Sequence, residues 1–484
     1  MGPIGPNCPK HRIVNRLCEG ACAGIGTGLG KGLGAGLGMG LWLCAMTLAA
    51  EAAVPEDVAA RLGEDLTPMG SEKAGNADGT IPAWTGGLTG IPDTVSFDPE
   101  SELHPNPFPE DRPLFTITPA NMAEHADKLT EGYTALLKTY PDYSMPVYPS
   151  RRSCAYPKAV YEANRRNAAL TALTPNGSGV TGGTFGLPFA IPGQGLEMVW
   201  NQTLRYRGFK LTRQFAAAPV TRRGDYTLQI VQDEAIIQWS DPGISHTDEL
   251  DNISLYYISN TVAPPRAAGN ILLDHETIDQ SKQDRAAWQY SPGTRRVRRA
   301  PNIAYDNPGF NSDALSTADA FDGFNGAPDR YDWRLIGKQE KYIAYNTYDA
   351  ALVPIADLLQ AGHLNQSHVR YELHRVWVIE ATLREGTRHV YGRRVFYIDE
   401  DATQLAAAEL YDSRGELWRV QEIHTLNYYH VPLCGSGAEV VYDLQNGRYL
   451  ALSMRNEQPP LDYSADHLDA DRYQPARLRR LGVR

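Results

Sequence analysis

The feature that most constrains the fold is a long run, residues 369–383, in which apolar and polar side chains alternate. At a rise of about 3.3 Å per residue, a strand of this length spans about 50 Å. Strands that long must twist or curl. The odd-numbered side chains of the run are Val369, Tyr371, Leu373, Arg375, Trp377, Ile379, Ala381 and Leu383. We therefore expect one apolar face along the whole strand, interrupted only by Arg375.

Three further strands follow at short intervals. The same alternation predicts them at 388–398, 403–411 and 416–424. The intervening turns read Arg384-Glu385-Gly386-Thr387, Asp399-Glu400-Asp401-Ala402 and Asp412-Ser413-Arg414-Gly415. Consecutive strands joined by such turns form an antiparallel meander. Strands do not alternate with helices here, so a parallel sheet is excluded.

From residue 207 onward, apolar side chains recur at every second position, as in β-strands. In one segment the apolar side chains move from one face of the predicted strand to the other. One face carries Tyr226, Leu228 and Ile230, and the other carries Ala235, Ile237 and Trp239. A swap of faces across Asp233-Glu234 predicts a β-bulge there. The residues thus predict an α+β protein, mainly antiparallel β, with one large, strongly curved sheet over residues 207–456.

The first half of the chain is predicted to cap this sheet. Residues 53–118 hold nine Pro and seven Gly, a composition typical of irregular segments that lie over a surface. Helices are expected from Thr118-Pro119 to Tyr140, at 156–172 and at 195–205. We therefore divide this part of the chain into an irregular, helical cap segment (53–206), the sheet domain (207–456) and a tail (457–484).

Residues 1–52 resemble a signal peptide. Lys10, Arg12 and Arg16 give a positive start, and the 19 residues of the run 32–50 carry no charge. Ala50-Glu51-Ala52 then fits a small-x-small cleavage site. This pattern predicts export and cleavage near Ala53. The alternative is an uncleaved transmembrane anchor.

Only two of the six cysteines, Cys154 and Cys434, lie beyond the predicted signal peptide. In an exported chain they can form one disulfide that joins the start and the end of the domain. A reduced, buried pair is the alternative. Neither cysteine belongs to a CxxC motif, so the sequence gives no support for zinc or thioredoxin-like chemistry.

Charge and motifs argue against several classes of function. The net charge of −11, from 46 basic and 57 acidic residues, disfavours nucleic acid as a partner. The sequence lacks the GxSxG, HExxH and EF-hand patterns. His363, His368, His374 and His389 do not form i,i+4 pairs, so we predict no metal site and no cofactor. Asp399 and Asp401 are read as solvated turn residues rather than as catalytic acids.

Two groups of residues are candidates for ligand binding. Arg296 and Arg298 share one face of a predicted strand, with Arg295, Val297 and Arg299 on the other. They either pair with carboxylates of this acidic protein or bind an anionic headgroup. A buried charge without a partner is costly, so the guanidinium of Arg375 needs one. Arg375 therefore either forms a structural ion pair or contacts a ligand. The aromatic candidates, which line a cavity or belong to the core, are Trp288, Tyr290, Trp377 and Tyr397.

Several stretches carry a family resemblance. The run 288–299 (WQYSPGTRRVRR), the run 394–401 (RVFYIDED) and the run 411–417 (YDSRGEL) resemble strand signatures of the bacterial LolA-like proteins that sort outer-membrane lipoproteins. More closely, the chain from about 55 to 484 resembles a large uncharacterised subfamily that is described as lipoprotein-sorting-like. The carrying stretches are 66–70, 83–87, 327–333, 370–377 and 475–482.

The resemblance implies a half-barrel of antiparallel strands with helices as a lid over an apolar cavity. It also implies a periplasmic location. Together with the residues, it predicts a non-enzymatic carrier or binding protein for a hydrophobic or lipid-like small molecule, working with an envelope transporter or an outer-membrane protein. The alternative is a protein-binding scaffold or assembly factor of the envelope, and a hydrolase ranks third.

Overall fold

The computed structural model describes residues 54–101 and 103–482, and the predicted signal peptide lies outside them. Within these residues one sheet of 15 strands dominates the structure. Its hydrogen-bonded order is β1-β2-β12-β13-β14-β15-β16-β17-β5-β6-β7-β8-β9-β10, and β11 pairs with β12 beside this path. The mainly antiparallel, curved sheet predicted from the alternation is confirmed.

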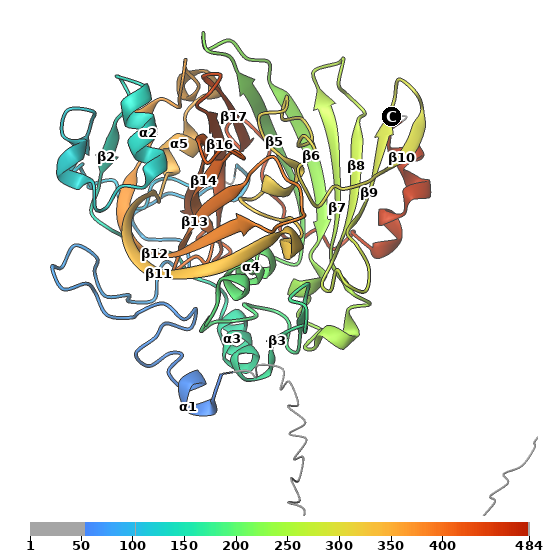
Figure 1. Ribbon diagram of the computed structural model, residues 1–484, viewed down its shortest axis with the longest axis horizontal. Helices are drawn as coiled ribbons and strands as arrows, with labels where there is room; N and C mark the ends of the chain where they lie inside the picture. Colours follow the sequence, from blue (N-terminus) through green and yellow to red (C-terminus); the bar gives the residue numbers. More distant parts are fainter. Residues whose placement is uncertain (1–53, 102, 483–484) are drawn as a thin grey trace, which may run out of the picture. The chain divides into compact units, whose positions relative to one another are not determined.

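Two meanders make up the sheet (Figure 1). The first comprises β5 (Lys210–Val220), β6 (Gln229–Ile236), β7 (Ile253–Ala263), β8 (Ile271–Thr277), β9 (Ala286–Ser291) and β10 (Arg296–Ala300). The second comprises β11 (Tyr331–Ala344), β12 (Tyr371–Leu383), β13 (Arg393–Asp399), β14 (Leu405–Tyr411), β15 (Leu417–Asn427), β16 (Cys434–Asp443) and β17 (Arg448–Met454). Antiparallel pairing of β17 with β5 joins the two meanders.

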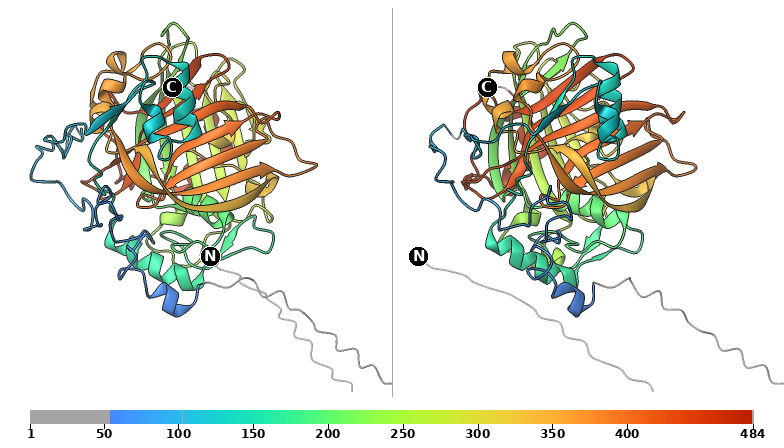
Figure 2. Two further views of the ribbon diagram at one scale, coloured as in Figure 1. Left: turned by 60° about the vertical axis from the view of Figure 1, so that its left-hand side comes forward. Right: turned by 90° about the vertical axis from the view of Figure 1, so that its left-hand side faces the viewer.

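Short strands and helices complete the described structure. The additional strands are β1 (Phe115–Ile117), β2 (Met145–Val147), β3 (Ala172–Leu173) and β4 (Val180–Thr181). The helices are α1 (Glu56–Ala59), α2 (Glu131–Thr139), α3 (Lys158–Leu170), α4 (Gly195–Leu204), α5 (Tyr348–Leu352), α6 (Ile355–Leu358) and α7 (Leu478–Leu481). The segment between α1 and β1 is irregular and lies outside the sheet (blue in Figure 2).

The helix expected from Pro119 to Tyr140 is shorter than predicted. Asn121 accepts hydrogen bonds from the backbone N–H and the hydroxyl of Thr118, which closes a local turn instead of starting a helix. A single 3₁₀ turn, Met122–His125, follows. The helix α2 begins only after Thr130, whose hydroxyl accepts a hydrogen bond from the backbone N–H of Tyr133 at 3.0 Å.

The two faces of the sheet are covered by different elements. We call the face that carries Ile379, Phe396, Ile423, Leu450 and Leu272 the inner face, and the opposite one the outer face. On the outer face α2 packs through Tyr133, Leu136 and Leu137, which are fully buried. On the inner face α4 packs through Met198 and Val199 against β12–β15. Burial of each large apolar side chain stabilises the fold by about 1.5–3 kcal/mol.

Both faces of β12 are therefore covered along most of its length. Val376 and Val378 belong to the outer core, while Ile379 and the partly buried Trp377 belong to the inner one. This corrects the expectation of a single apolar face. The even-numbered polar residues of the strand, Glu372 and His374, are buried in hydrogen-bonded pairs rather than exposed to solvent.

The β-bulge expected at Asp233-Glu234 is absent from the pairing of β5 with β6. The register between these strands is continuous from Lys210 paired with Ile236 to Ala217 paired with Gln229. Asp233 breaks the apolar alternation because it is a buried charge, fully covered and bonded to Arg213 on the neighbouring strand. A register shift does occur where β6 pairs with β7, opposite Ile230 and Val231, and the extra residue there is Val262 on β7.

A disulfide joins the cap segment to the sheet. Cys154 and Cys434 are bonded, with their Cα atoms 5.7 Å apart, and both residues are buried. Close to it, the guanidinium of Arg152 donates two hydrogen bonds to the carboxylate of Asp401, in the turn between β13 and β14. The cap segment is thus fixed to the second meander at two neighbouring points.

Candidate functional site

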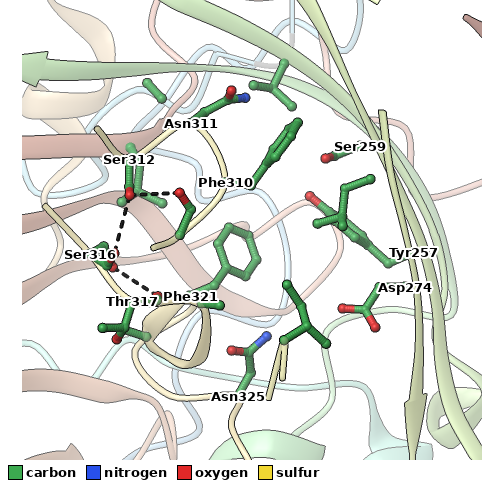
Figure 3. A pocket seen from close by; sticks show the side chains of 18 of the residues that line it. Tyr257, Ser259, Asp274, Phe310, Asn311, Ser312, Ser316, Thr317, Phe321 and Asn325 are labelled. Carbon is green, nitrogen blue, oxygen red and sulfur yellow. Dashed lines mark hydrogen bonds between the residues drawn. The ribbon is translucent and has the colours of Figure 1, made fainter. Parts of the chain in front are cut away.

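A cavity of about 110 Å³ lies against the inner face of the first meander and β17 (Figure 3). Its wall on the sheet side is mostly apolar. The apolar side chains are Phe215, Ala217, Val231, Leu255, Leu272, Leu450 and Leu452. They come from five strands, and the inner-facing positions of each strand recur with period two. The curvature of the sheet brings these positions around one space.

The irregular segment 301–327, between β10 and β11, covers the cavity. It contributes Ile303, Phe310 and Phe321 to the wall, and the two phenylalanines are only partly buried. The expectation that helices of the N-terminal half cover the cavity is corrected here, because α4 fills the neighbouring part of the inner face and the cover comes from the sheet domain itself.

The covering segment is held by side chains rather than by strand pairing. Its backbone hydrogen bonds run within the segment, for example from Gly309 to Ser316 and from Ala318 to Asn307. Long side chains of the sheet and α4 bind its carbonyl groups instead. The donors and the residues whose carbonyls accept are Gln202 to Asp322, Gln229 to Asn311, Arg285 to Asn325, Arg419 to Ala314 and Gln421 to Ala320. Ion pairs of Asp319 with Arg394 and of Asp322 with Arg205 add to these bonds, so the cover is attached to the rest of the protein without being part of any ladder of the sheet.

One side of the cavity is polar. Asp274 and Glu276, on β8, and Arg285 line it. The Nε of Arg285 donates to Oδ2 of Asp274 at 2.8 Å, and its Nη2 contacts the same oxygen. The other carboxylate oxygen, Oδ1 of Asp274, is buried without a hydrogen-bond partner among the described residues. Figure 3 shows the Asp274 carboxylate beside the cavity, together with Tyr257 and Asn325.

A second cavity of about 110 Å³ shares the walls formed by Tyr257 and Phe321 and contains a buried charge network. Asp322 binds the guanidinium groups of Arg205 and Arg207 at 2.6 and 2.7 Å. The backbone N–H of Asp322 also donates to Glu439. Burial and the nearby Asp322 carboxylate raise the pKa of Glu439 to about 7.

An open cleft of about 610 Å³ lies next to the first cavity. Both are lined by Gly309, Asn311 and Ser312, so this turn of the covering segment separates them. The cleft is bordered by polar and cyclic side chains, among them Tyr226, Pro264 and Arg266. The turn at 309–312 thus borders both the apolar cavity and the open cleft.

The structure places the aromatic candidates of the sequence away from this cavity. Trp288 and Tyr290, on β9, pair with Leu273 and Ile271 and therefore lie on the outer face. There the tail covers them through Tyr473 and Leu478. This corrects the expectation that Trp288 and Tyr290 line the cavity. Their alternation was visible in the sequence, but the tail that covers them was not.

Trp377 and Tyr397 also lie elsewhere. Trp377 is on the inner face, beside the region filled by α4, and the Nζ of Lys338 lies 4.9 Å from its ring centre. Tyr397 faces α2 on the outer side, and its hydroxyl donates to Glu409 at 3.1 Å. Burial and Glu409 raise the pKa of Tyr397 above its ordinary value. Neither side chain lines the cavity, which corrects that expectation too.

The candidate arginines fall into two kinds. Arg375 is buried and contacts Glu400 at 3.3 Å and Glu72 at 3.5 Å, so it forms the structural ion pair. Arg296 and Arg298, on the edge strand β10, are exposed, and neither forms an ion pair with a carboxylate of the described residues. The carboxylate pairing considered for them is not found there.

The acidic turn between β13 and β14 is not solvated, contrary to expectation. Asp399, Glu400 and Asp401 are all buried, and they contact His374, Lys338 and Arg152. Burial lowers the pKa of His374, but the nearby carboxylates of Asp399 and Glu372 outweigh this and raise that pKa to about 9. The cluster works as a buried electrostatic link between the cap segment and the sheet.

One pattern in the sequence could have revealed cavity residues that the sequence analysis missed. In the strand 271–277, Leu272, Asp274 and Glu276 occupy alternate positions and therefore share a face. Two acids on the same face as a leucine indicate a partly polar interior wall that needs a cation, which Arg285 supplies across the hairpin. In the part of the chain that the structure describes, no cluster of His, Cys, Asp and Glu is arranged to hold a metal ion.

No helix among the described residues has the length and apolar character needed to span a membrane. The chain is 48% identical over 439 residues to the uncharacterized protein PA3922 of Pseudomonas aeruginosa, and the match covers 90% of this chain and 95% of that protein.

Two solved structures are more distantly similar. A DUF1329 family protein from Desulfovibrio piger has 14% identity and a TM-score of 0.39, over 56% of this chain and 92% of that one. The LolA superfamily protein NE2245 from Nitrosomonas europaea has 11% identity and a TM-score of 0.34, over 58% and 98%. The family model described as "Protein of unknown function (DUF1329)" matches residues 116–479. The expected resemblance to an uncharacterised family is therefore confirmed, and the chain belongs to the DUF1329 family.

Proposed function

We propose that this protein is a periplasmic, non-enzymatic carrier that holds a small hydrophobic or lipid-like ligand in the cavity between the inner face and the segment 301–327. One observation carries the proposal: an apolar wall built from five strands faces a cover that is not paired with the sheet. Sites for small molecules are concave and mostly apolar, with a few placed polar groups.

The size of the cavity limits which ligands fit without movement of the covering segment. A cavity of about 150 Å³ is enough for benzene, so about 110 Å³ accommodates only a small apolar group. A longer ligand requires Phe310 and Phe321 to move outward with their segment. Exposing a phenyl ring costs about 1.5–3 kcal/mol, which an apolar ligand of similar area offsets when it takes the vacated place.

Two features support a periplasmic setting. The sequence 1–52 has the pattern of a cleavable signal peptide. The disulfide between Cys154 and Cys434 belongs to proteins of oxidising compartments. In this setting the carrier would exchange its ligand with an envelope transporter or an outer-membrane protein, and the proposal includes no chemical reaction.

The experiment is a binding titration with 1-aminoanthracene, an apolar fluorescent probe, on protein expressed from the full chain. Wild-type protein should enhance the fluorescence of the probe. Ala217→Phe fills the cavity and should weaken binding at least about tenfold. Trp377→Ala removes an aromatic group from the inner face outside the cavity, and it should change binding by less than about twofold.

Native mass spectrometry with organic extraction, on protein purified without added ligand, identifies what the cavity holds. A bound small apolar molecule that is lost in Ala217→Phe supports the proposal. Absence of probe binding by the wild type, or equal weakening in Ala217→Phe and Trp377→Ala, overturns it. Circular dichroism of each variant checks that the sheet is intact.

A further inference from the structure

Exposed arginines gather where the sheet ends at β10. Four of them are in or beside this strand: Arg295, Arg296, Arg298 and Arg299. Three more are in and just before α7, namely Arg477, Arg479 and Arg480. The helix α7 packs against β10, with Leu478 buried in the same core as Tyr290 and the partly buried Val297. We call these seven residues the arginine patch.

None of the seven side chains makes a hydrogen bond or ion pair with another described residue. Elsewhere in the described chain most guanidinium groups are paired, as for Arg152, Arg285 and Arg394 with their carboxylates. The protein as a whole has a net charge of −11. Seven unpaired cations in one corner of an acidic protein mark a surface whose counter-charge comes from another molecule.

A purely structural role accounts for only part of the patch. The strand β10 is the last one in the sheet order, and charged side chains on an edge strand prevent pairing with other chains. This explains the arginines of β10. It does not explain those of α7, which is a helix and has no strand edge to protect.

The neighbouring turns add apolar surface. In the turn between β7 and β8, Gly269 lies close to Pro292, in the turn between β9 and β10, and to Gly482 after α7. The β7–β8 side of this corner carries Val262, which is 39% exposed, and Pro264, which also borders the open cleft. Cationic and apolar groups therefore lie together, beside the cleft that adjoins the ligand cavity.

We propose that the arginine patch is a docking surface for an anionic phospholipid bilayer. The seven guanidinium groups line neither of the two cavities nor the cleft, so they offer no pocket for a single carboxylate. They project from both faces of an edge strand and from a helix beside it, an arrangement that suits an array of lipid phosphates. The proposal stands on these charges alone and does not require the carrier function.

The test is co-sedimentation with vesicles, using protein expressed from the full chain. Vesicles of phosphatidylcholine with about 30% phosphatidylglycerol should bind the wild type at low salt, whereas pure phosphatidylcholine should not. Each basic side chain near an anionic bilayer contributes roughly a fivefold gain in partitioning, and salt screens it. Binding should therefore fall steeply between about 0.05 and 0.5 M salt.

The key variant replaces Arg296, Arg298, Arg479 and Arg480 by Gln. It should reduce binding to the anionic vesicles at least about tenfold. A matched control replaces four other exposed arginines, Arg61, Arg165, Arg388 and Arg414, by Gln, and thus removes the same charge. All these proteins share residues 1–52, so a difference between the two variants reports on the patch.

Three results would overturn the proposal. The first is wild-type protein that stays in the supernatant with anionic vesicles at low salt. The second is equal loss of binding in both variants, which would indicate general charge rather than this surface. The third is salt-sensitive self-association without vesicle binding, measured by analytical ultracentrifugation, which would identify an acidic protein surface as the partner. Probe binding by the arginine variant distinguishes this outcome from failure of the carrier proposal.

Discussion

Arg285 binds Asp274 through a single carboxylate oxygen, Oδ2, and leaves Oδ1 buried beside the cavity wall without a hydrogen-bond partner among the described residues. A buried acceptor without a partner is costly, by about 1–3 kcal/mol. A ligand that brings a hydroxyl or amine to this oxygen recovers that energy. The proposed ligand is therefore an apolar molecule with one hydrogen-bond donor.

Asp274→Asn should reverse the polarity of the site. The amide oxygen must face Arg285, because the guanidinium needs an acceptor, so the amide N–H groups take the place of Oδ1. We expect hexanol to bind about 5- to 100-fold more weakly than to the wild type, and 2-hexanone to bind more tightly. Displacement of 1-aminoanthracene measures both. Equal changes for the alcohol and the ketone would show that Oδ1 does not select the ligand.

Removal of the disulfide should destabilise the protein strongly. Cys154 and Cys434 are 280 residues apart, and chain entropy assigns a cross-link over so long a loop on the order of 5–6 kcal/mol. Chemical unfolding of Cys154→Ser/Cys434→Ser should have a midpoint well below that of the oxidised wild type. The wild type treated with reductant is the control, and it should unfold near the midpoint of the double variant.

His374 should make stability fall in alkaline solution. Its folded pKa of about 9 exceeds the ordinary value of 6.5, so the folded protein holds a proton that the unfolded chain releases. The associated stabilisation, roughly 3 kcal/mol, is complete below about pH 6.5 and is lost as the pH rises through 9. In His374→Gln the unfolding free energy should vary much less between pH 7 and 9.5. An imidazole titration by NMR with a midpoint below 7 would contradict this.

Glu439 should act in a lower pH range. Its folded pKa of about 7 lies above the ordinary 4.5, so protonation favours the folded state, and this contribution is lost as the pH rises from about 4.5 to 7. In Glu439→Gln the side-chain amide can still accept the hydrogen bond from the backbone N–H of Asp322, and it can donate one to the hydroxyl of Ser453. The melting temperature of this variant should depend less on pH between 5 and 8 than that of the wild type. If the melting temperature of the variant depends on pH as steeply as that of the wild type, groups other than Glu439 cause the dependence.

Much of the sheet was predictable because its strands obey period two. The strands β12 to β15 fall within or close to their expected ranges, and the turns between them contain the expected Gly, Asp and Ser residues. Asp233 was misread, since alternation cannot distinguish a bulge from a buried charge whose partner, Arg213, is on another strand. Thr118 was misread because Asn121 competes for it locally.

The site was far less predictable than the fold. Period two assigns Trp288 and Tyr290 to one face, but it does not say which face is inner. That depends on the tail, whose Tyr473 and Leu478 cover them. The segment 301–327 has no periodicity that would reveal its place over the cavity, because side chains from distant strands, such as Arg419 and Gln421, hold it.

The pairing of β17 with β5 has a consequence for synthesis of the chain. The strand β5 ends at Val220, but its neighbour on this side begins only at Arg448. During translation the first meander therefore presents an unpaired, largely apolar edge until nearly the whole chain has been made. Topologies dominated by such distant contacts fold slowly. The newly made first meander therefore needs protection from aggregation until β17 arrives.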